Sequence, residues 1–354
     1  MTEEGRGNML TADVNALVNT VNTVGVMGKG IALQFRRAFP ANYKAYQKAC
    51  ARGEVTLGRI YVFDTGQLMS RRYVLNFPTK EHWRSKSRLP DIEAGLEDLV
   101  RVVTELGIES VAIPALGCGN GGLDWAVVKP LIERACARMP RVRCVIFPPS
   151  GAPSAAEMPN ATRRPELTPL RALLVMAIAR YHDHARLQQV SDGVSELEIQ
   201  KLAYFLQVVG AALPLSFTKG RYGPYDERLP YVLDALEGHY LVGFGDRSAH
   251  VTDLVPIKPL GDAIEVAAAG LKQAPEDVNR LEDVLHLVDG FETPYSLELL
   301  ATVHFAAMQE PQSGDPDVLS TRVSGWNLRK ARLFSSQHVR IAAERLAERG
   351  LLPT

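Results

Sequence analysis

Two glycine-rich stretches, each between a strand-like and a helix-like segment, constrain this chain more than any other feature. They are VGVMGKGIALQF at positions 24–35 and PALGCGNGGLDW at positions 114–125. Backbone N–H groups approach a phosphate closely where glycine removes the side chain, and a following helix start adds a favourable dipole. Neighbouring parallel strands bring such loops to one edge of a sheet. We therefore predict that the two loops grip a diphosphate, rather than being two tight turns.

The first loop matches neither of the common nucleotide-binding motifs. A Walker A loop needs a hydroxyl residue after its lysine, but Gly30 follows Lys29, and Thr23 stands where the first glycine belongs. A dinucleotide fingerprint needs a third glycine at position 33, which is Leu33. The loop is therefore expected to hold a phosphate ligand of a different kind.

The first half of the chain alternates between two kinds of segment. Short β-branched, apolar segments lie at 16–22, 59–65, 73–78, 110–116 and 142–148. Segments with apolar residues at helical spacing lie at 30–53, 89–107 and 124–139. This alternation predicts an α/β domain, with a mixed and mostly parallel central sheet flanked by helices.

The second half is predicted to be mainly α-helical. A stretch rich in Pro, Ala, Ser and Thr separates it from the first half, which predicts domains at 1–152 and 168–354 with a linker at 153–167. Ser195 and Glu198 fit a capping box at the start of one helix. Amphipathic segments lie at 170–187, 195–210, 276–290, 294–309 and 335–350.

The two halves differ in charge. Residues 1–150 hold 20 Lys and Arg against 14 Asp and Glu, whereas residues 151–354 hold 20 against 26. A basic half suits an anionic ligand and an acidic half suits a basic partner, although chance asymmetry would give the same counts. The acidic charge includes Glu196, Glu198, Asp226 and Glu227.

Composition argues against several classes of protein. No apolar run approaches the ~20 residues of a membrane span, and the polar N-terminus MTEEGRGNML does not look like a signal peptide. The cysteines lack CxxC spacing and are expected to be reduced thiols in a cytoplasmic protein. His182 and His184 lie on different faces of a predicted helix, so neither a metal nor another cofactor is expected. The four cysteines are Cys50, Cys118, Cys136 and Cys144.

A third motif, NFPTKEHWRSKSR at 76–88, follows a predicted strand and combines basic residues with an aromatic ring. Such a combination suits single-stranded nucleic acid, because cations contact phosphates and a base stacks on the ring. A solvated loop with a half-buried tryptophan would have the same pattern. The candidate DNA contacts are Trp83, Arg84, Lys86 and Arg88.

Together these motifs resemble the DarG family, the DNA ADP-ribosyl glycohydrolase antitoxins that are paired with DarT toxins. The resemblance covers residues 7–151 through N-x-V-G-V-M-G-K-G-I-A-L-Q-F, N-F-P-T-K-x-H-W and P-x-L-G-x-G-N-G-G-L-D-W. It continues through LEIQKLAYF at 197–205 and RYGPYDERL at 221–229. The resemblance implies a macrodomain that binds ADP-ribose, followed by a toxin-binding domain.

The resemblance also implies roles for individual residues. Lys80 stands at the position of the family's catalytic lysine, and Asn22 would lie beside the distal ribose as a second catalytic residue. Asn8, where many macrodomains carry aspartate, would contact adenine together with Met9. The remaining ADP-ribose contacts would be Gly28, Lys29, Gly30, Ile31, Ala32, Leu116, Gly117, Cys118, Gly119, Asn120, Gly121, Gly122 and Leu123.

The expected function is that of an antitoxin with two activities. It would remove ADP-ribose from thymine in single-stranded DNA and bind its cognate toxin. Lys80 would act as a cation or as a nucleophile; the second role needs a pKa lowered by burial or by neighbours such as Arg84. Related macrodomains pair the lysine with an aspartate, whereas this loop has Asn120. The alternatives are an ADP-ribose reader, a protein or ester ADP-ribose hydrolase, and a toxin-sequestering scaffold with an inactive macrodomain.

Overall fold

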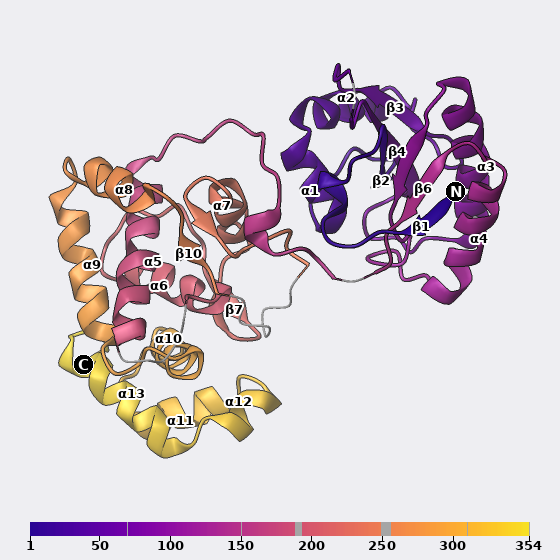
Figure 1. Ribbon diagram of the computed structural model, residues 1–354. Helices are drawn as coiled ribbons and strands as arrows, with labels where there is room; N and C mark the ends of the chain where they lie inside the picture. Colours follow the sequence, from indigo (N-terminus) through magenta and orange to yellow (C-terminus); the bar gives the residue numbers. More distant parts are fainter. Residues whose placement is uncertain (69, 150, 188–192, 249–255, 310, 354) are drawn as a thin grey trace. The chain divides into compact units, whose positions relative to one another are not determined.

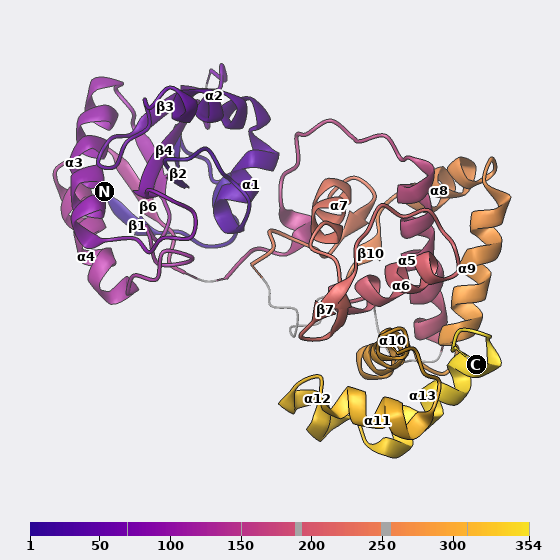
Figure 2. The ribbon, with the colours of Figure 1, turned by 180° about the vertical axis from the view of Figure 1, so that it is seen from behind.

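The computed structural model describes residues 1–354 except 69, 150, 188–192, 249–255, 310 and 354. It contains two compact units (Figures 1 and 2). Unit 1 is Met1–Arg163 with Gly245–Ser248, and unit 2 is Arg164–Phe244 with Ala249–Thr354. The division falls inside the predicted linker, and the short segment 245–248 joins unit 1 from a distant part of the sequence.

Unit 1 is built on a six-stranded sheet with the order β1-β6-β5-β2-β4-β3. All neighbouring strands are parallel except β3 and β4, so the predicted mixed, mostly parallel sheet is confirmed. The edge strand β1 was not predicted, because three exposed residues carry no periodic pattern. The strands are β1 (Thr2–Glu4), β2 (Ala16–Asn22), β3 (Tyr61–Asp64), β4 (Tyr73–Lys80), β5 (Ser110–Ile113) and β6 (Arg143–Ile146).

Helices cover both faces of this sheet (Figure 1). Side chains alternate along a strand, so Ala16 and Val18 of β2 join the core beneath α3 and α4, whereas Leu17 packs with Phe35 of α1. On the α1 side, Tyr46 of α2 packs near the end of β2. The helices are α1 (Gly30–Ala38), α2 (Pro40–Ala51), α3 (Leu89–Glu105) and α4 (Trp125–Ala137).

The single helix expected over 30–53 is wrong, because the structure breaks it at Phe39. Pro40 has no N–H group and disfavours helical geometry in the residue before it. Phe39 accordingly has φ −131° and ψ 68°, and Pro40 begins α2. The break turns the chain away from the end of α1 and lets α2 pack against the strand end with its own apolar face.

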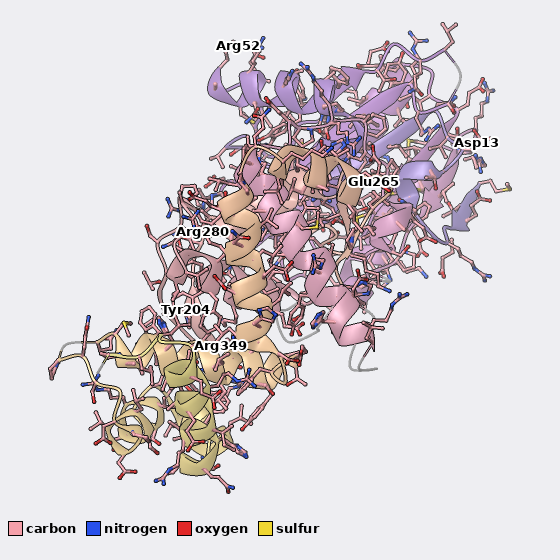
Figure 3. The ribbon with its side chains drawn as sticks, turned by 90° about the vertical axis from the view of Figure 1, so that its left-hand side faces the viewer. Asp13, Arg52, Tyr204, Glu265, Arg280 and Arg349 are labelled. Carbon is pink, nitrogen blue, oxygen red and sulfur yellow. The ribbon has the colours of Figure 1, made fainter. Side chains whose placement is uncertain are left out.

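Unit 2 is rich in helices around one hydrophobic core, as predicted. Tyr204, labelled in Figure 3, lies in this core and shares a 2.6 Å hydrogen bond with Nδ1 of His304. Its helices are α5 (Pro169–Leu187), α6 (Glu196–Val208), α7 (Leu229–Leu236), α8 (Ala263–Leu271), α9 (Pro275–Val288), α10 (Pro294–Ala307), α11 (Pro316–Ser324), α12 (Leu328–Leu333) and α13 (Ser336–Glu348). Two short antiparallel ribbons join them: β7 (Thr218–Gly220) with β8 (Gly223–Tyr225), and β9 (Leu241–Val242) with β10 (Lys258–Pro259).

Part of the acidic charge of unit 2 is buried. Within its described residues two lysines are buried, Lys201 and Lys330, against six carboxylates. Glu198 completes the predicted capping box, and Asp226 pairs with Arg228, so neither offers its charge to a partner at the surface. No helix in the described part of the chain is long and apolar enough to cross a membrane. The six buried carboxylates are Glu198, Asp226, Asp234, Glu237, Glu292 and Glu298.

Candidate functional site

The two glycine loops and Lys80 meet at one edge of the sheet of unit 1. The strands β5, β2 and β4 are neighbours and run parallel, so their carboxyl ends lie side by side. Asn22 and Lys80 are register partners at the ends of β2 and β4. A methyl group on Gly30 would lie 3.3 Å from Nδ2 of Asn120, which places the first loop against the second.

Lys80 connects the end of β4 to the second glycine loop. Its Nζ donates a 3.0 Å hydrogen bond to the backbone carbonyl of Asn120. The side chain is half-buried, and this burial lowers the pKa of Lys80 below its ordinary value. Neighbouring cations such as Arg84 are not among the causes of this lowered pKa. In a loop that has no aspartate to pair with the lysine, the backbone carbonyl of Asn120 is therefore the hydrogen-bond acceptor for Lys80.

Asn22 organises the first loop. Its Nδ2 donates to the carbonyl of Val26 at 2.6 Å, and its Oδ1 accepts the N–H groups of Val24 and Val26. Tyr46 donates its hydroxyl to the backbone carbonyl of Asn22. These bonds hold residues 22–26 as a tight turn next to Lys80. The predicted contact of Asn22 with the ribose stays a prediction.

The first loop leads directly into the start of α1. Gly30 has φ +62°, and its N–H donates a 2.9 Å hydrogen bond to the carbonyl of Asp246, in the segment of unit 1 that comes from residues 245–248. The N–H groups of Ile31 and Ala32 are in the first turn, where an α-helix provides them with no internal partner. Lys29 is exposed and makes no capping hydrogen bond. The helix start thus presents N–H groups and a positive dipole end to an anion.

The second loop is held rigidly by its glycines. Gly117 and Gly122 have φ +72° and +76°, which residues with a side chain rarely adopt. A methyl group on Gly121 would lie 2.4 Å from the carbonyl oxygen of Gly117 and 2.3 Å from Oγ of Ser87. Asp124 caps α4 by accepting the N–H of Ala126. Gly119, Asn120 and Gly122 are exposed at the tip of the loop.

The remaining predicted ADP-ribose residues differ in how exposed they are. Met9 and Leu116 are buried in the core, at 5% and 0% exposure, so their side chains support the site from below. Asn8 is half-buried, and its Oδ1 accepts the N–H of Leu10 while its Nδ2 donates to the carbonyl of Glu157. Cys118 and Leu123 are half-buried against the core beneath the second loop.

The basic loop after β4 places an aromatic ring at the surface. Trp83 is 45% exposed, and the Arg84 guanidinium lies 4.4 Å from the centre of its ring. Lys86 is exposed, whereas Arg88 forms an ion pair with Asp91 in the first turn of α3. Trp83, Arg84 and Lys86 are therefore accessible to a nucleic-acid strand, and Arg88 is partly engaged.

Sequence reasoning missed the residues that support the site from behind. Asn19 of β2 donates to Asn76 of β4, and Asn76 donates to Asn42 of α2; all three are 0% exposed. Ser87 donates its N–H to the carbonyl of Gly121 and fixes the second loop. Polar residues at the centres of two apolar strands were the available signal for Asn19 and Asn76.

The Macro domain family model matches residues 18–132, so the sheet with two glycine loops at its carboxyl edge is that of a macrodomain. The chain is 45% identical over 352 residues to a DNA ADP-ribosyl glycohydrolase of Mycobacterium tuberculosis, covering 98% of this chain and 99% of the relative. It is 47% identical over 347 residues to a protein of the same name from Thermus aquaticus, covering 98% and 93%. The chain therefore belongs to the DNA ADP-ribosyl glycohydrolase family.

A third relative matches a smaller part of the chain. It is named a DNA ADP-ribosyl transferase-DNA ADP-ribosyl glycohydrolase fusion protein and comes from Thermosipho africanus. The two are 38% identical over 148 residues, which is 38% of each chain. In that relative the names of both activities belong to a single polypeptide.

Proposed function

We propose that unit 1 hydrolyses the N-glycosidic bond between ADP-ribose and thymine in single-stranded DNA. The observation that carries the proposal is the half-buried Lys80 ammonium, which lies between the strand end of Asn22 and the second glycine loop. The start of α1 and the two glycine loops would supply N–H groups for the diphosphate. A protein that only recognised ADP-ribose would need these loops but no lysine beside them.

Lys80 would act where the ribose joins the base. The carbonyl of Asn120 orients its Nζ. The first loop would hold the distal ribose nearby. A protonated lysine there would stabilise negative charge on the departing base. An unprotonated lysine would instead attack the anomeric carbon, and burial favours this form by lowering the pKa. Borohydride trapping of a covalent adduct would distinguish these two roles.

The exposed pair of Trp83 and Arg84 supports a DNA substrate. The ring offers a stacking surface for a base next to the modified thymine, and Arg84 and Lys86 offer charge to the flanking phosphates. This surface follows Lys80 directly along the chain. A strand that lay on it would therefore bring its neighbouring thymine close to the lysine.

Residues 168–354 would bind the cognate DNA ADP-ribosyl transferase, so that the chain acts as an antitoxin in the cytoplasm. The fusion relative supports this partnership, because its name joins transferase and glycohydrolase in one chain. The full-length match to the glycohydrolases extends through unit 2, which a catalytic macrodomain alone would not need. Residues 1–152 would then repair the DNA while the second domain restrains the enzyme that modifies it.

The test follows release of ADP-ribose from an oligonucleotide that carries it on thymine, without added metal. We expect release by the unmodified protein and a loss of at least about 100-fold in Lys80→Ala, a typical effect of removing a catalytic group. Lys44→Ala is the matched control, because Lys44 is an exposed lysine on α2. Tight ADP-ribose binding without release by any variant would instead identify a reader.

A further inference from the structure

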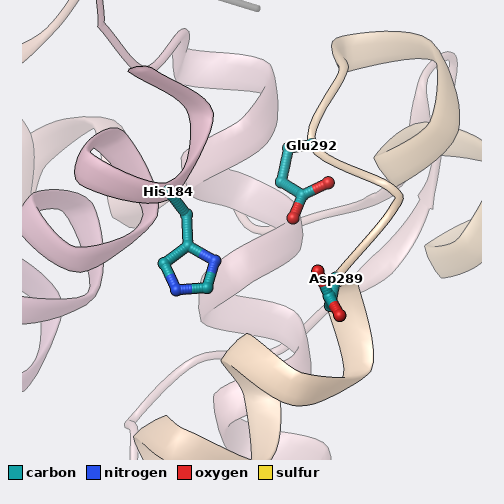
Figure 4. Close-up of side chains that lie close together, drawn as sticks. All are labelled: His184, Asp289 and Glu292. Carbon is teal, nitrogen blue, oxygen red and sulfur yellow. The ribbon is translucent and has the colours of Figure 1, made fainter. Parts of the chain in front are cut away.

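We infer that unit 2 contains a divalent metal site formed by His184, Asp289 and Glu292. The three side chains offer one imidazole nitrogen and two carboxylate oxygens, and these atoms all lie within 4.8 Å of one another. Figure 4 shows the three side chains pointing into one shared space. None of them belongs to the macrodomain or to the proposed hydrolytic reaction.

The chain brings these residues together from two places. His184 lies in the last turn of α5, and Asp289 immediately follows α9. Gly290, with φ +81°, turns the chain sharply, and the N–H of Phe291 donates to the carbonyl of Val288. This short turn places Asp289 and Glu292 on the same side of the connection to α10, facing His184 (Figure 4).

The spacing of the three donor atoms suits coordination. The side chains of His184 and Asp289 form no hydrogen bond or salt bridge with another residue in the described part of the chain, whereas Glu292 has a further partner. A cation between three atoms at most 4.8 Å apart lies no more than about 2.8 Å from each. Small side-chain rotations would shorten the distance from the cation to each donor atom to roughly 2.0–2.2 Å, the length of zinc–nitrogen and zinc–oxygen bonds.

The electrostatic environment favours a cation. Glu292 is 3% exposed. Burial raises the pKa of the Tyr181 phenol most, Glu198 raises it next, and the Glu292 carboxylate adds the smallest contribution. Tyr181 donates its hydroxyl to Glu198, a second buried carboxylate. Near the C-terminal part of α5, Tyr181 is thus close to two buried carboxylates, and His184 is close to Glu292 and Asp289. Among the described residues of unit 2, buried carboxylates outnumber buried lysines. A bound cation would compensate this charge.

The donor set indicates which ion would bind. One imidazole with two carboxylates suits Zn²⁺ better than Ca²⁺ or Mg²⁺, which prefer oxygen alone. The ion would tie the end of α5 to the connection between α9 and α10 and so stabilise unit 2. Sequence spacing gave no sign of the site, because its ligands come from distant segments and His182 does not take part.

The experiment measures Zn²⁺ binding to the full-length, tag-free protein by calorimetry, after treatment with a chelator. The matched variants are His184→Gln and Asp289→Asn, which keep side-chain size, and the control is Asp283→Asn, at an exposed carboxylate on α9. We expect one Zn²⁺ per chain and a higher unfolding temperature in the unmodified protein and the control. Both variants should bind at least tenfold more weakly.

Two outcomes would overturn the inference. One is no Zn²⁺ binding to the unmodified protein. The other is equal binding by all variants, which would locate the zinc elsewhere. The unfolding temperature of each metal-free variant, compared with that of the metal-free parent, separates lost ligands from lost structure. Release of ADP-ribose from DNA should not respond to the chelator, so a failed site leaves the proposed hydrolase untouched.

Discussion

Backbone groups perform much of the work that side chains perform in other hydrolytic sites. The carbonyl of Asn120 accepts from Lys80, the helix start supplies N–H groups for an anion, and Gly121 lets the second loop close on Gly117. The site is therefore sensitive to small displacements of the chain as well as to the loss of a functional group.

Substituting Gly121 should disturb ADP-ribose binding far more than substituting Gly119, two residues away. A methyl group on Gly121 would overlap the carbonyl of Gly117 and Oγ of Ser87, whereas a methyl group on Gly119 would have no atom within 4 Å. We expect Gly121→Ala to weaken ADP-ribose binding by about tenfold or more, and Gly119→Ala to change it little. Calorimetric titration with ADP-ribose checks both, and equal losses would show that the loop tolerates the added methyl.

Individual residues were predictable where local rules decide their role. Asp124 and Ser195 are helix caps, as their position before an apolar run indicates. Lys80 could be named from its motif, but its contact with a backbone carbonyl could not, because this depends on how two loops from different strands meet. The contact of Asp246 with unit 1 could not be predicted, because its partner Gln34 is far away in the sequence.

The helix α10 combines an apolar surface with buried polar groups. His304 is 4% exposed, and burial lowers its pKa to about 4. Its neutral ring accepts the hydroxyl of Tyr204. Nearer the start of the same helix, Glu298 pairs with Arg329 and with the buried Lys330, whose pKa burial lowers to about 8. These groups fix the position of α10 inside unit 2, but they leave it dependent on pH.

The buried histidine should make unit 2 unstable in acid. An unfolded chain binds a proton near pH 6.5 but the folded one only near 4, so stability falls as pH drops through this window. The total loss is roughly 3 kcal/mol. His304→Gln keeps an acceptor for Tyr204 but does not titrate. The urea-unfolding midpoint of this variant should therefore change less between pH 7 and 5 than that of the unmodified protein. Hydrogen exchange in α10 would localise the effect, and identical pH dependence in the variant would refute it.

Long elements were predicted well, and short ones poorly. The main helices of unit 2 and the parallel strands of unit 1 have a clear apolar period and lie where the sequence indicates. Pro40 could have predicted the break between α1 and α2, but the apolar pattern continues on both sides of it and favoured a single helix. The two-residue strands β9 and β10 depend on pairing with each other, which no local pattern encodes.

For the chain as a whole, the difference in charge between its halves is less informative than the counts suggest. Six carboxylates are in the described interior of unit 2, so they cannot face a partner. The expectation that the acidic half suits a basic partner is weakened accordingly. Contact through shape and exposed apolar side chains is the better expectation, and Tyr231 and Leu328 are examples at 63% and 79% exposure.

If unit 2 binds the cognate transferase mainly through shape and apolar side chains, the affinity should depend little on salt. We expect its dissociation constant to rise by less than about tenfold between 50 and 500 mM sodium chloride, because screening acts on exposed charges only. The measurement uses the full-length protein and the purified transferase at several salt concentrations. A steep linear loss of affinity would instead favour charge complementarity, and no binding at any salt concentration would remove the antitoxin proposal for unit 2.

The segment Gly245–Ser248 belongs to unit 1, although residues 164–244 before it belong to unit 2. Within unit 1, Asp246 is 3% exposed, accepts from Nε2 of Gln34 at 2.6 Å, and its carbonyl accepts the N–H of Gly30. Recombination between relatives at the linker would separate the gene segments for Gln34 and Asp246. A hybrid would keep a complete pair only if both parents carried compatible residues at positions 34 and 246. The two halves of the gene are thus expected to be inherited together rather than exchanged as independent modules.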